Sequence, residues 1–132
     1  MYKYTLLFFL LFSSLNASNS SNDALAHGDF KKALKLLNQE IKTGDATAEY
    51  NLALMYYRGD GVEQNLTKSA ELLESSAQKG YKRAIENVGR IYMQLLQFDK
   101  AKKWLKINAN NGDKSAQELL KSIESTKLSE PR

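Results

Sequence analysis

Hydrophobic residues recur three or four positions apart along six segments of this chain, which is the spacing of one face of an α-helix. The pattern predicts helices over residues 30–42, 46–57, 66–78, 83–95, 98–109 and 114–125, preceded by a short helix that ends at His27. No stretch alternates between hydrophobic and polar residues as a half-buried strand would. The fold class that we expect is therefore all-α.

One short motif occurs in three copies. It reads K-A-L-K-L-L from Lys32, K-S-A-E-L-L from Lys68 and K-A-K-K-W-L from Lys100. A glycine and then an alanine follow each copy at the same offsets, at positions 44 and 48, 80 and 84, and 112 and 116. The copies start 36 and then 32 residues apart, and such a period indicates helical hairpins that bury their apolar faces against one another. We expect an α-solenoid of about three antiparallel helical hairpins.

The first link between hairpins is longer than its later counterpart. It reads R-G-D-G-V-E-Q-N-L-T between Tyr57 and Lys68, and it exceeds the later link, M-Q-L-L-Q-F-D, by three residues. Gly59 and Gly61 permit backbone conformations that are closed to other residues. We therefore expect a turn under which Val62 folds back.

The segment from Ala48 to Gly80 resembles a repeat of the Sel1-like family, a relative of the tetratricopeptide repeats. The family's pattern is A-x-x-x-L-G-x-x-Y, a G-x-G-V loop, a K-A pair and a closing A-x-x-G. This chain matches it at Ala48, Leu52, Tyr56, Gly59, Gly61, Val62, Lys68, Ala77 and Gly80. Ala53 replaces one family glycine, which returns as Gly89 in the next copy. The resemblance covers roughly residues 29 to 124 and implies a right-handed superhelix.

The last copy departs from the family pattern. Lys121 and Glu124 stand where a small residue and a tyrosine are usual, and a polar final helix suits the capping end of a solenoid. Many exported members carry a cysteine pair in each hairpin, and this chain has no cysteine. We expect a repeat domain over residues 29–126 and a disordered tail over residues 127–132.

The first 17 residues have the organisation of a secretory signal. Lys3 precedes the apolar run T-L-L-F-F-L-L-F at residues 5–12, and small and polar residues then lead to Ala17. The run is shorter than the roughly 20 residues of a transmembrane helix. We expect cleavage after Ala17, a loose N-terminus with a short helix over residues 18–28, and a periplasmic or secreted protein without a transmembrane span.

Composition argues against several classes of function. The 132 residues include 19 Lys and Arg against 15 Asp and Glu, and the two signs are interspersed, so a nucleic-acid partner is not expected. Without cysteine there is no thiol catalysis and no thiolate metal site, and one histidine, His27, does not make a zinc site. We expect no metal and no cofactor.

Two short strings are typical of penicillin-recognising enzymes. Ser76 and Lys79 match S-x-x-K, and the residues Lys42-Thr43-Gly44 match K-T-G. Both lie at the ends of predicted repeat helices, K-T-G comes first, and no S-D-N is present, so packing and turn roles are favoured. An envelope hydrolase of the β-lactamase-like or penicillin-binding type stays as the alternative, because that activity is attributed to cysteine-rich relatives.

Three other features have structural explanations. We expect His27 at a solvated helix end and Trp104 at the edge of the core. The basic residues around one helix are expected to form a solvated face, with an anionic partner as the alternative; they are Lys100, Lys102, Lys103 and Lys106.

The resemblance also implies a binding surface, since the first helix of each hairpin lines the concave groove of tetratricopeptide-like stacks. Two such helices are offset by 36 residues, which places residues off their packing faces in register. The pairs are Thr47 with Arg83, Tyr50 with Glu86, Asn51 with Asn87, Leu54 with Arg90, and Tyr57 with Met93.

These ten residues suit the binding of an extended peptide better than catalysis. The asparagines can donate and accept hydrogen bonds along a peptide backbone, and the arginines can hold a carboxylate. Tyr50 and Tyr57 either offer apolar contact or pack against the adjoining repeat. The sequence predicts a non-enzymatic protein- or peptide-binding scaffold in the bacterial cell envelope. A structural subunit that uses its convex face, and end-to-end self-association, are further options.

Overall fold

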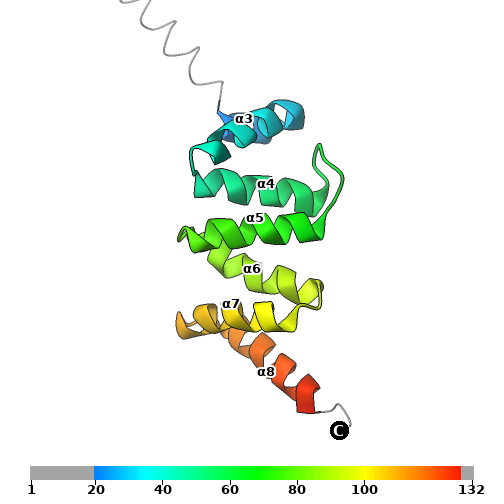
Figure 1. The fold of residues 1–132 in the computed structure, drawn as a ribbon, viewed down its shortest axis with the longest axis vertical. Coiled ribbons are helices and arrows are strands. Elements are labelled where there is room, and N and C mark those ends of the chain that lie inside the picture. The colour runs from blue at the N-terminus through cyan, green and yellow to red at the C-terminus, as the bar shows by residue number, and fades with distance from the viewer. Residues whose placement is uncertain (1–19, 129–132) are drawn as a thin grey trace, which may run out of the picture.

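The computed structural model describes residues 20–128, and in this part of the chain every element of secondary structure is an α-helix. Each helix packs on its neighbours in chain order, so that antiparallel hairpins stack into an elongated array (Figure 1). The helices are α2 (Ser21–Ala26), α3 (Phe30–Lys42), α4 (Ala46–Arg58), α5 (Leu66–Gln78), α6 (Lys82–Gln94), α7 (Phe98–Asn110) and α8 (Lys114–Leu128). The predicted all-α solenoid is confirmed.

The predicted helix limits agree closely with the structure. α3 and α5 have the predicted limits, α6 begins and ends one residue earlier, and α4 and α7 are each one residue longer. α8 continues to Leu128, past the predicted end of the repeat domain. The predicted signal at residues 1–17 and the last four residues of the predicted tail lie outside the described residues.

The segment expected to be a loose N-terminus is docked on the repeats from Ser20 onward. Ser20 caps α2 by accepting a hydrogen bond from the backbone N–H of Asp23 at 3.1 Å. Ser21 donates a hydrogen bond of 2.6 Å to the carboxylate of Glu40 in α3, and Ala24 is buried. This short helix therefore belongs to the first hairpin.

Local signals explain where the helices begin and end. The side chains of Asp29, Asp45 and Asn65 cap α3, α4 and α5 by accepting hydrogen bonds from backbone N–H groups of the first turn. Turns between helices use residues with positive φ, where glycine has no Cβ to collide with the backbone. These residues are Gly28, Gly44, Gly59, Gly61, Gly80 and Gly112, and Leu96 has positive φ in the turn between α6 and α7.

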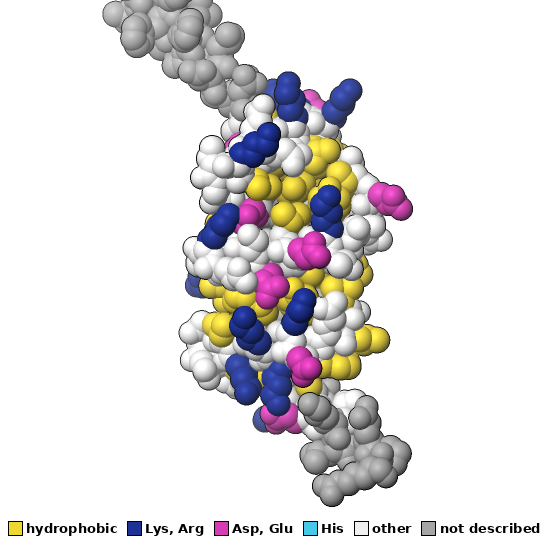
Figure 2. All heavy atoms as spheres, in the orientation of Figure 1, with side chains coloured by type: hydrophobic (Ala, Val, Ile, Leu, Met, Phe, Trp, Pro, Cys, Tyr) yellow, Lys and Arg dark blue, Asp and Glu magenta, His cyan; other side chains and the backbone are white. Residues whose placement is uncertain are grey.

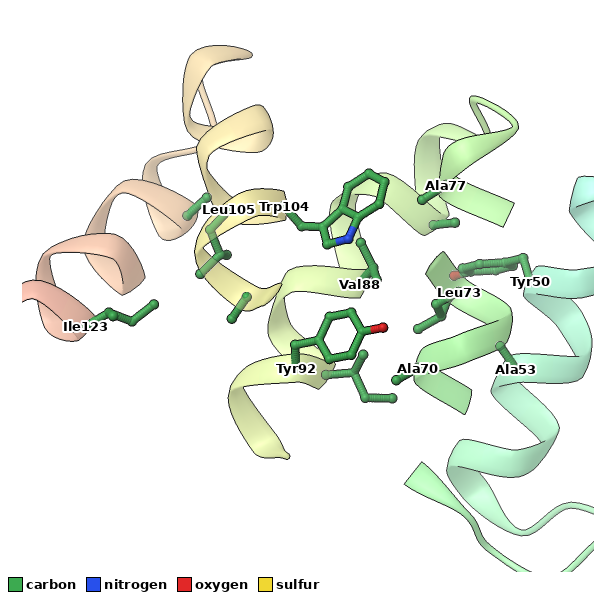
Figure 3. Packing of buried hydrophobic residues seen from close by; sticks show 14 residues of the cluster. Tyr50, Ala53, Ala70, Leu73, Ala77, Val88, Tyr92, Trp104, Leu105 and Ile123 are labelled. Atoms are coloured by element: carbon green, nitrogen blue, oxygen red, sulfur yellow. The ribbon is translucent and has the colours of Figure 1, made fainter. Parts of the chain in front are cut away.

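The core consists of two hydrophobic clusters, one around α2, α3 and α4 and one that extends from α4 to α8. Ala33, Ser69 and Ala101, the small residue of each repeated motif, are completely buried, which allows neighbouring helices to approach closely. Tyr92 and Trp104 supply the large aromatic groups on either side of Val88 (Figure 3). Val62 is half-buried in the cluster around α2, α3 and α4, so its predicted return under the turn is confirmed.

Candidate binding face

One side of the stack is formed by α2, α4, α6 and α8, and we call it the even-helix face. Hydrogen bonds link each of these helices to the next along this side. Asn51 Nδ2 donates to Asn22 Oδ1 at 2.9 Å, and Gln94 Nε2 donates to the Tyr57 hydroxyl at 3.3 Å. Arg90 Nη2 donates to Asp113 Oδ2 at 3.3 Å. These three hydrogen bonds bring side chains of neighbouring even helices together on one side of the stack.

Tyr50 is a correction to the predicted site. Its side chain is only 9% exposed and belongs to the core, where its ring centroid lies 5.1 Å from that of Tyr81. Figure 3 shows Tyr50 directed from α4 against α5. The residue is held between two repeats, as the alternative interpretation of the two tyrosines required, and it cannot contact a ligand in the groove.

The other nine predicted residues reach the surface to different extents. Leu54 and Met93 pack on the edge of the core, with part of each side chain accessible. The half-buried members of the set are Thr47, Asn51, Leu54, Glu86, Asn87 and Met93, and the exposed members are Tyr57, Arg83 and Arg90. Tyr57 is thus the tyrosine that remains available, with 37% of its surface exposed.

The two asparagines in register do not have the same partners. Asn51 bonds to Asn22 on the preceding even helix, whereas Asn87 Nδ2 donates to the backbone oxygen of Arg83, one turn earlier in its own helix, at 2.6 Å. Each amide therefore has one donor engaged within the protein. Their hydrogen-bonding role toward a peptide stays a prediction.

A cleft of about 640 Å³ deepens the even-helix face where α6 meets the turn between α7 and α8. Glu86 and Arg90 line it, together with Lys82, Asn111 and Asp113. Its charges are mixed, because Lys82 Nζ lies 3.9 Å from Glu86 Oε1 and Arg90 pairs with Asp113. Arg83 is exposed and makes no ion pair with any described residue.

Three residues of this face were not predicted from the sequence, namely Asn22, Gln94 and Asp113. A signal for Asp113 was present, since it precedes α8 as Asp45 precedes α4, and both aspartates cap their helices. The contact of Asp113 with Arg90 crosses from one hairpin to the next and is not contained in the repeat pattern.

The S-x-x-K string does not form a reactive pair. Ser76 is completely buried and donates a hydrogen bond of 2.6 Å to the backbone oxygen of Ala46. Lys79 Nζ lies 2.7 Å from Glu49 Oε1, so its ammonium group faces a carboxylate. Thr43 and Gly44 form the turn after α3, where the Thr43 hydroxyl donates to the Glu40 oxygen at 2.7 Å. The packing and turn roles predicted for both strings are confirmed.

A hydrogen-bonded cluster centred on Glu74 joins α5, α6 and α7. The Tyr92 hydroxyl donates to one Glu74 oxygen at 2.6 Å, and Trp104 Nε1 donates to the other at 3.2 Å. Burial alone would raise the pKa of Glu74, but these two donors and the positive charges of Lys100 and Lys103 hold it below its usual value. Burial, and then the bond to Glu74, raise the pKa of the Tyr92 hydroxyl.

Three of the four lysines predicted to form a basic face on α7 have contacts on the protein surface. Lys100 lies over the ring of Tyr92 and Lys103 over that of Trp104, at 5.0 and 5.5 Å from the ring centroids. Lys102 Nζ is 3.8 Å from a Glu124 oxygen. Charges of both signs are interspersed on the face drawn in Figure 2, which agrees with a solvated surface.

The Glu74 cluster predicts a specific dependence of stability on pH. A carboxyl group whose pKa is lower in the folded state stabilises that state above its unfolded pKa, and this contribution is lost as the pH falls through the folded pKa. Replacing Glu74 with Gln should cost about 1 kcal/mol at neutral pH, because this half-buried group accepts two hydrogen bonds. The cost should shrink as the pH falls below about 4.

Chemical denaturation of both proteins between neutral pH and pH 3 measures this difference. The matched control is Glu71→Gln, which neutralises an exposed carboxylate on the same helix. A Glu74→Gln penalty that stayed constant across this range would show that the charge of Glu74 makes no contribution.

The remaining candidates carry no site. His27 is an exposed C-cap residue at the end of α2, as predicted, with Nδ1 2.8 Å from the backbone oxygen of Asp23. Within residues 20–128, no three of the side chains that commonly bind metals come together. No described helix has the length and apolar character needed to cross a bilayer.

Comparison with known proteins places these features in a family context. Residues 46–81, which comprise α4, α5 and the turn after α5, match the family model of the Sel1 repeat. Over 41 residues the chain is 44% identical to a sel1-like repeat-containing protein of Acanthamoeba polyphaga mimivirus, and this match covers 31% of the chain but 7% of the viral protein.

A solved structure is similar over a larger part of the chain. The crystal structure of a Sel1 repeat protein from Oxalobacter formigenes aligns with a TM-score of 0.56 and 22% sequence identity. The alignment covers 86% of this chain and 97% of the other. At this identity, the match shows a shared fold.

Proposed function

The chain is a Sel1 repeat protein, a helical-repeat scaffold related to the tetratricopeptide repeats, and from this premise we propose that its even-helix face binds an extended segment of another protein. The observation that carries the proposal is the continuity of this face across α2, α4, α6 and α8, with a cleft of about 640 Å³ at its α6–α8 end. The role is non-enzymatic.

The chemistry of the face favours a particular kind of segment. Arg83 is exposed and has no ion-pair partner among the described residues, so a carboxylate is the group that it would recognise. The charge of Arg90 is already offset by Asp113, and that of Glu86 by Lys82. Apolar contact comes from the accessible parts of Tyr57, Leu54 and Met93. We therefore propose an extended peptide with one acidic group beside apolar side chains.

We place this activity in the bacterial cell envelope. The support is the pattern of residues 1–17, with Lys3 ahead of eight apolar or weakly polar residues and a small residue at position 17. The mature protein would then act in the periplasm or outside the cell. Expression of the full chain followed by mass determination of the exported form tests this, and an uncleaved chain in the cytoplasm would contradict it.

Selection from a displayed library of random peptides tests the binding proposal. Peptides that carry an acidic residue next to apolar ones should be enriched, with dissociation constants in the micromolar range that are typical of weak, transient contacts. Replacing Arg83 and Arg90 with alanine should weaken binding at least about tenfold, because the carboxylate loses its partner Arg83 and the charge of Asp113 is no longer offset by Arg90.

The control removes the same charge from the other side of the stack. Lys35 of α3 and Lys106 of α7 are both exposed, and replacing both with alanine lowers the net charge by the same amount as the arginine variant. Equal losses in the two double variants would mean that general electrostatic attraction, and not the even-helix face, holds the peptides.

A further inference from the structure

The turn between α6 and α7 contains an unusual residue for its conformation. After α2, α3, α5 and α7, the residue that follows the C-cap is a glycine with positive φ. After α6 that position is Leu96, at a φ of 57° and with 71% of its surface exposed. A leucine in left-handed backbone conformation is unfavourable because its Cβ crowds the following carbonyl, and exposing its side chain adds no compensating burial. Backbone strain of this kind indicates that Leu96 has a role other than stabilising the fold.

The pocket beside Leu96 lies next to Phe98, and the equivalent site next to Phe30 is filled by a turn of the chain. Phe30 and Phe98 are the first residues of α3 and α7, at equivalent places in the repeat. The turn after α4 covers Phe30: a Cβ built on Gly61 would lie 2.5 Å from Phe30 Cβ, and Val62 belongs to the same hydrophobic cluster. A corresponding turn for Phe98 would have to follow α8, and the described residues contain none, so Phe98 is 41% exposed.

The uncovered site is a pocket of about 510 Å³. Its apolar lining comes from Leu96, Phe98 and Ile123. Its rim carries two acidic and two basic side chains, and one pair is in contact, with Lys102 Nζ 3.8 Å from Glu124 Oε1. Figure 2 shows hydrophobic side chains at the surface on this edge of the molecule, where α6 turns into α7.

We propose that this patch joins two copies of the chain across a two-fold axis, with Leu96 of each copy entering the pocket of the other. The repeat indicates what fits the pocket, namely a turn that carries an aliphatic residue, as the turn with Val62 does over Phe30. The turn with Leu96 is such a turn, and it projects beside the pocket. A patch that contains both a projecting group and a matching hollow is self-complementary, which is what a two-fold contact requires.

The charges on the rim also favour a second copy. Asp99 and Glu124 balance Lys100 and Lys102, so the rim has no net charge with which to select an acidic or a basic partner. Across a two-fold axis, the acids of one copy can face the bases of the other. This contact lies at the α7–α8 end of the stack, away from most of the even-helix face, so it does not depend on the proposed peptide binding.

Cysteine cross-linking of the full chain tests the contact, since the chain has no cysteine of its own. Gln97 lies in the same turn and makes no side-chain capping bond, so Gln97→Cys places one thiol beside the proposed axis. A short bis-maleimide reagent should give a covalent dimer at micromolar protein concentration. Gln39→Cys, exposed on α3 at the other end of the stack, is the control and should give none. Association through the apolar N-terminal segment would not produce this difference.

Leu96→Gly in the Gln97→Cys background removes the projecting group while keeping the turn. Each dimer loses two buried leucines, so the dissociation constant should rise about a hundredfold and the covalent dimer should disappear at low protein concentration. The thermal midpoint should be unchanged or higher, because glycine adopts this backbone conformation without strain. Ile107→Ala, which removes an exposed side chain of α7 outside the pocket, should leave the dimer intact.

Two results would overturn the proposal. One is a Gln97→Cys protein that cross-links no more than Gln39→Cys. The other is a Leu96→Gly variant that retains its helical circular dichroism and still forms the dimer at the original concentration.

Discussion

Replacing Tyr92 with alanine is expected to lower the free energy of unfolding by about 4 kcal/mol. The side chain is 2% exposed and lies in the core between α5 and α7 (Figure 3). Alanine would leave a cavity that the surrounding helices cannot close without moving their backbones, and it would remove one donor from Glu74. Urea denaturation followed by circular dichroism measures the loss.

Tyr92→Phe separates packing from hydrogen bonding. It keeps the ring and removes only the hydroxyl that donates to Glu74 at 2.6 Å, so its cost should be about 1.5 kcal/mol. If the phenylalanine variant lost as much stability as the alanine variant, the hydrogen bond and not the ring would be the main contribution of this residue.

Replacing Lys79 with alanine is expected to cost about 3 kcal/mol, although the lysine itself is partly exposed. Its partner, Glu49, is 5% exposed, and Glu49 Oε2 is a buried oxygen without a hydrogen-bond partner. The other oxygen accepts from Lys79 at 2.7 Å and from the Ser75 hydroxyl at 2.9 Å. Without the lysine, a buried carboxylate between α4 and α5 would keep a single neutral donor, which leaves its charge largely uncompensated.

Two further variants check this explanation. Lys79→Met combined with Glu49→Leu removes both charges and should recover most of the lost stability, because apolar groups can fill a buried ion-pair site. Lys82→Ala breaks an exposed pair with Glu86 and should cost less than about 0.5 kcal/mol. A double variant no more stable than Lys79→Ala would show that the loss comes from packing of the lysine stem.

The helices and the stack could be predicted from the sequence because their causes are local or periodic. Capping residues such as Asp29 and Asp45 and the turn glycines set the helix ends through bonds to neighbouring backbone groups. The small residues Ala33, Ser69 and Ala101 recur at one place in the repeated motif and are buried where helices approach each other. The register between even helices predicted which side chains of α4 and α6 lie on one side of the stack, and their role in binding stays a prediction.

The accessibility of individual side chains on that face depended on tertiary structure. Tyr50 and Tyr57 lie two turns apart on α4, so helical spacing treats them alike. Tyr81, from the turn between α5 and α6, packs on the ring of Tyr50, whereas Tyr57 lies near the C-terminal end of α4 and is 37% exposed. Asn51 and Asn87 are likewise in register, but their hydrogen-bond partners differ. Asn51 bonds to Asn22 of α2, whereas Asn87 bonds to the backbone oxygen of Arg83 in its own helix.

The sequence by itself thus determined the helices, their order and the side of the stack that each helix faces, since caps, turns and apolar periodicity act within one or two repeats. Only the tertiary structure decided which of the residues at equivalent places in the repeat are buried by another part of the chain. Phe30 and Phe98 occupy the same place in the repeat, and the turn with Gly61 covers one while no described turn covers the other. The physical reason is that burial depends on the next repeat along the stack, which a pattern within one repeat does not contain.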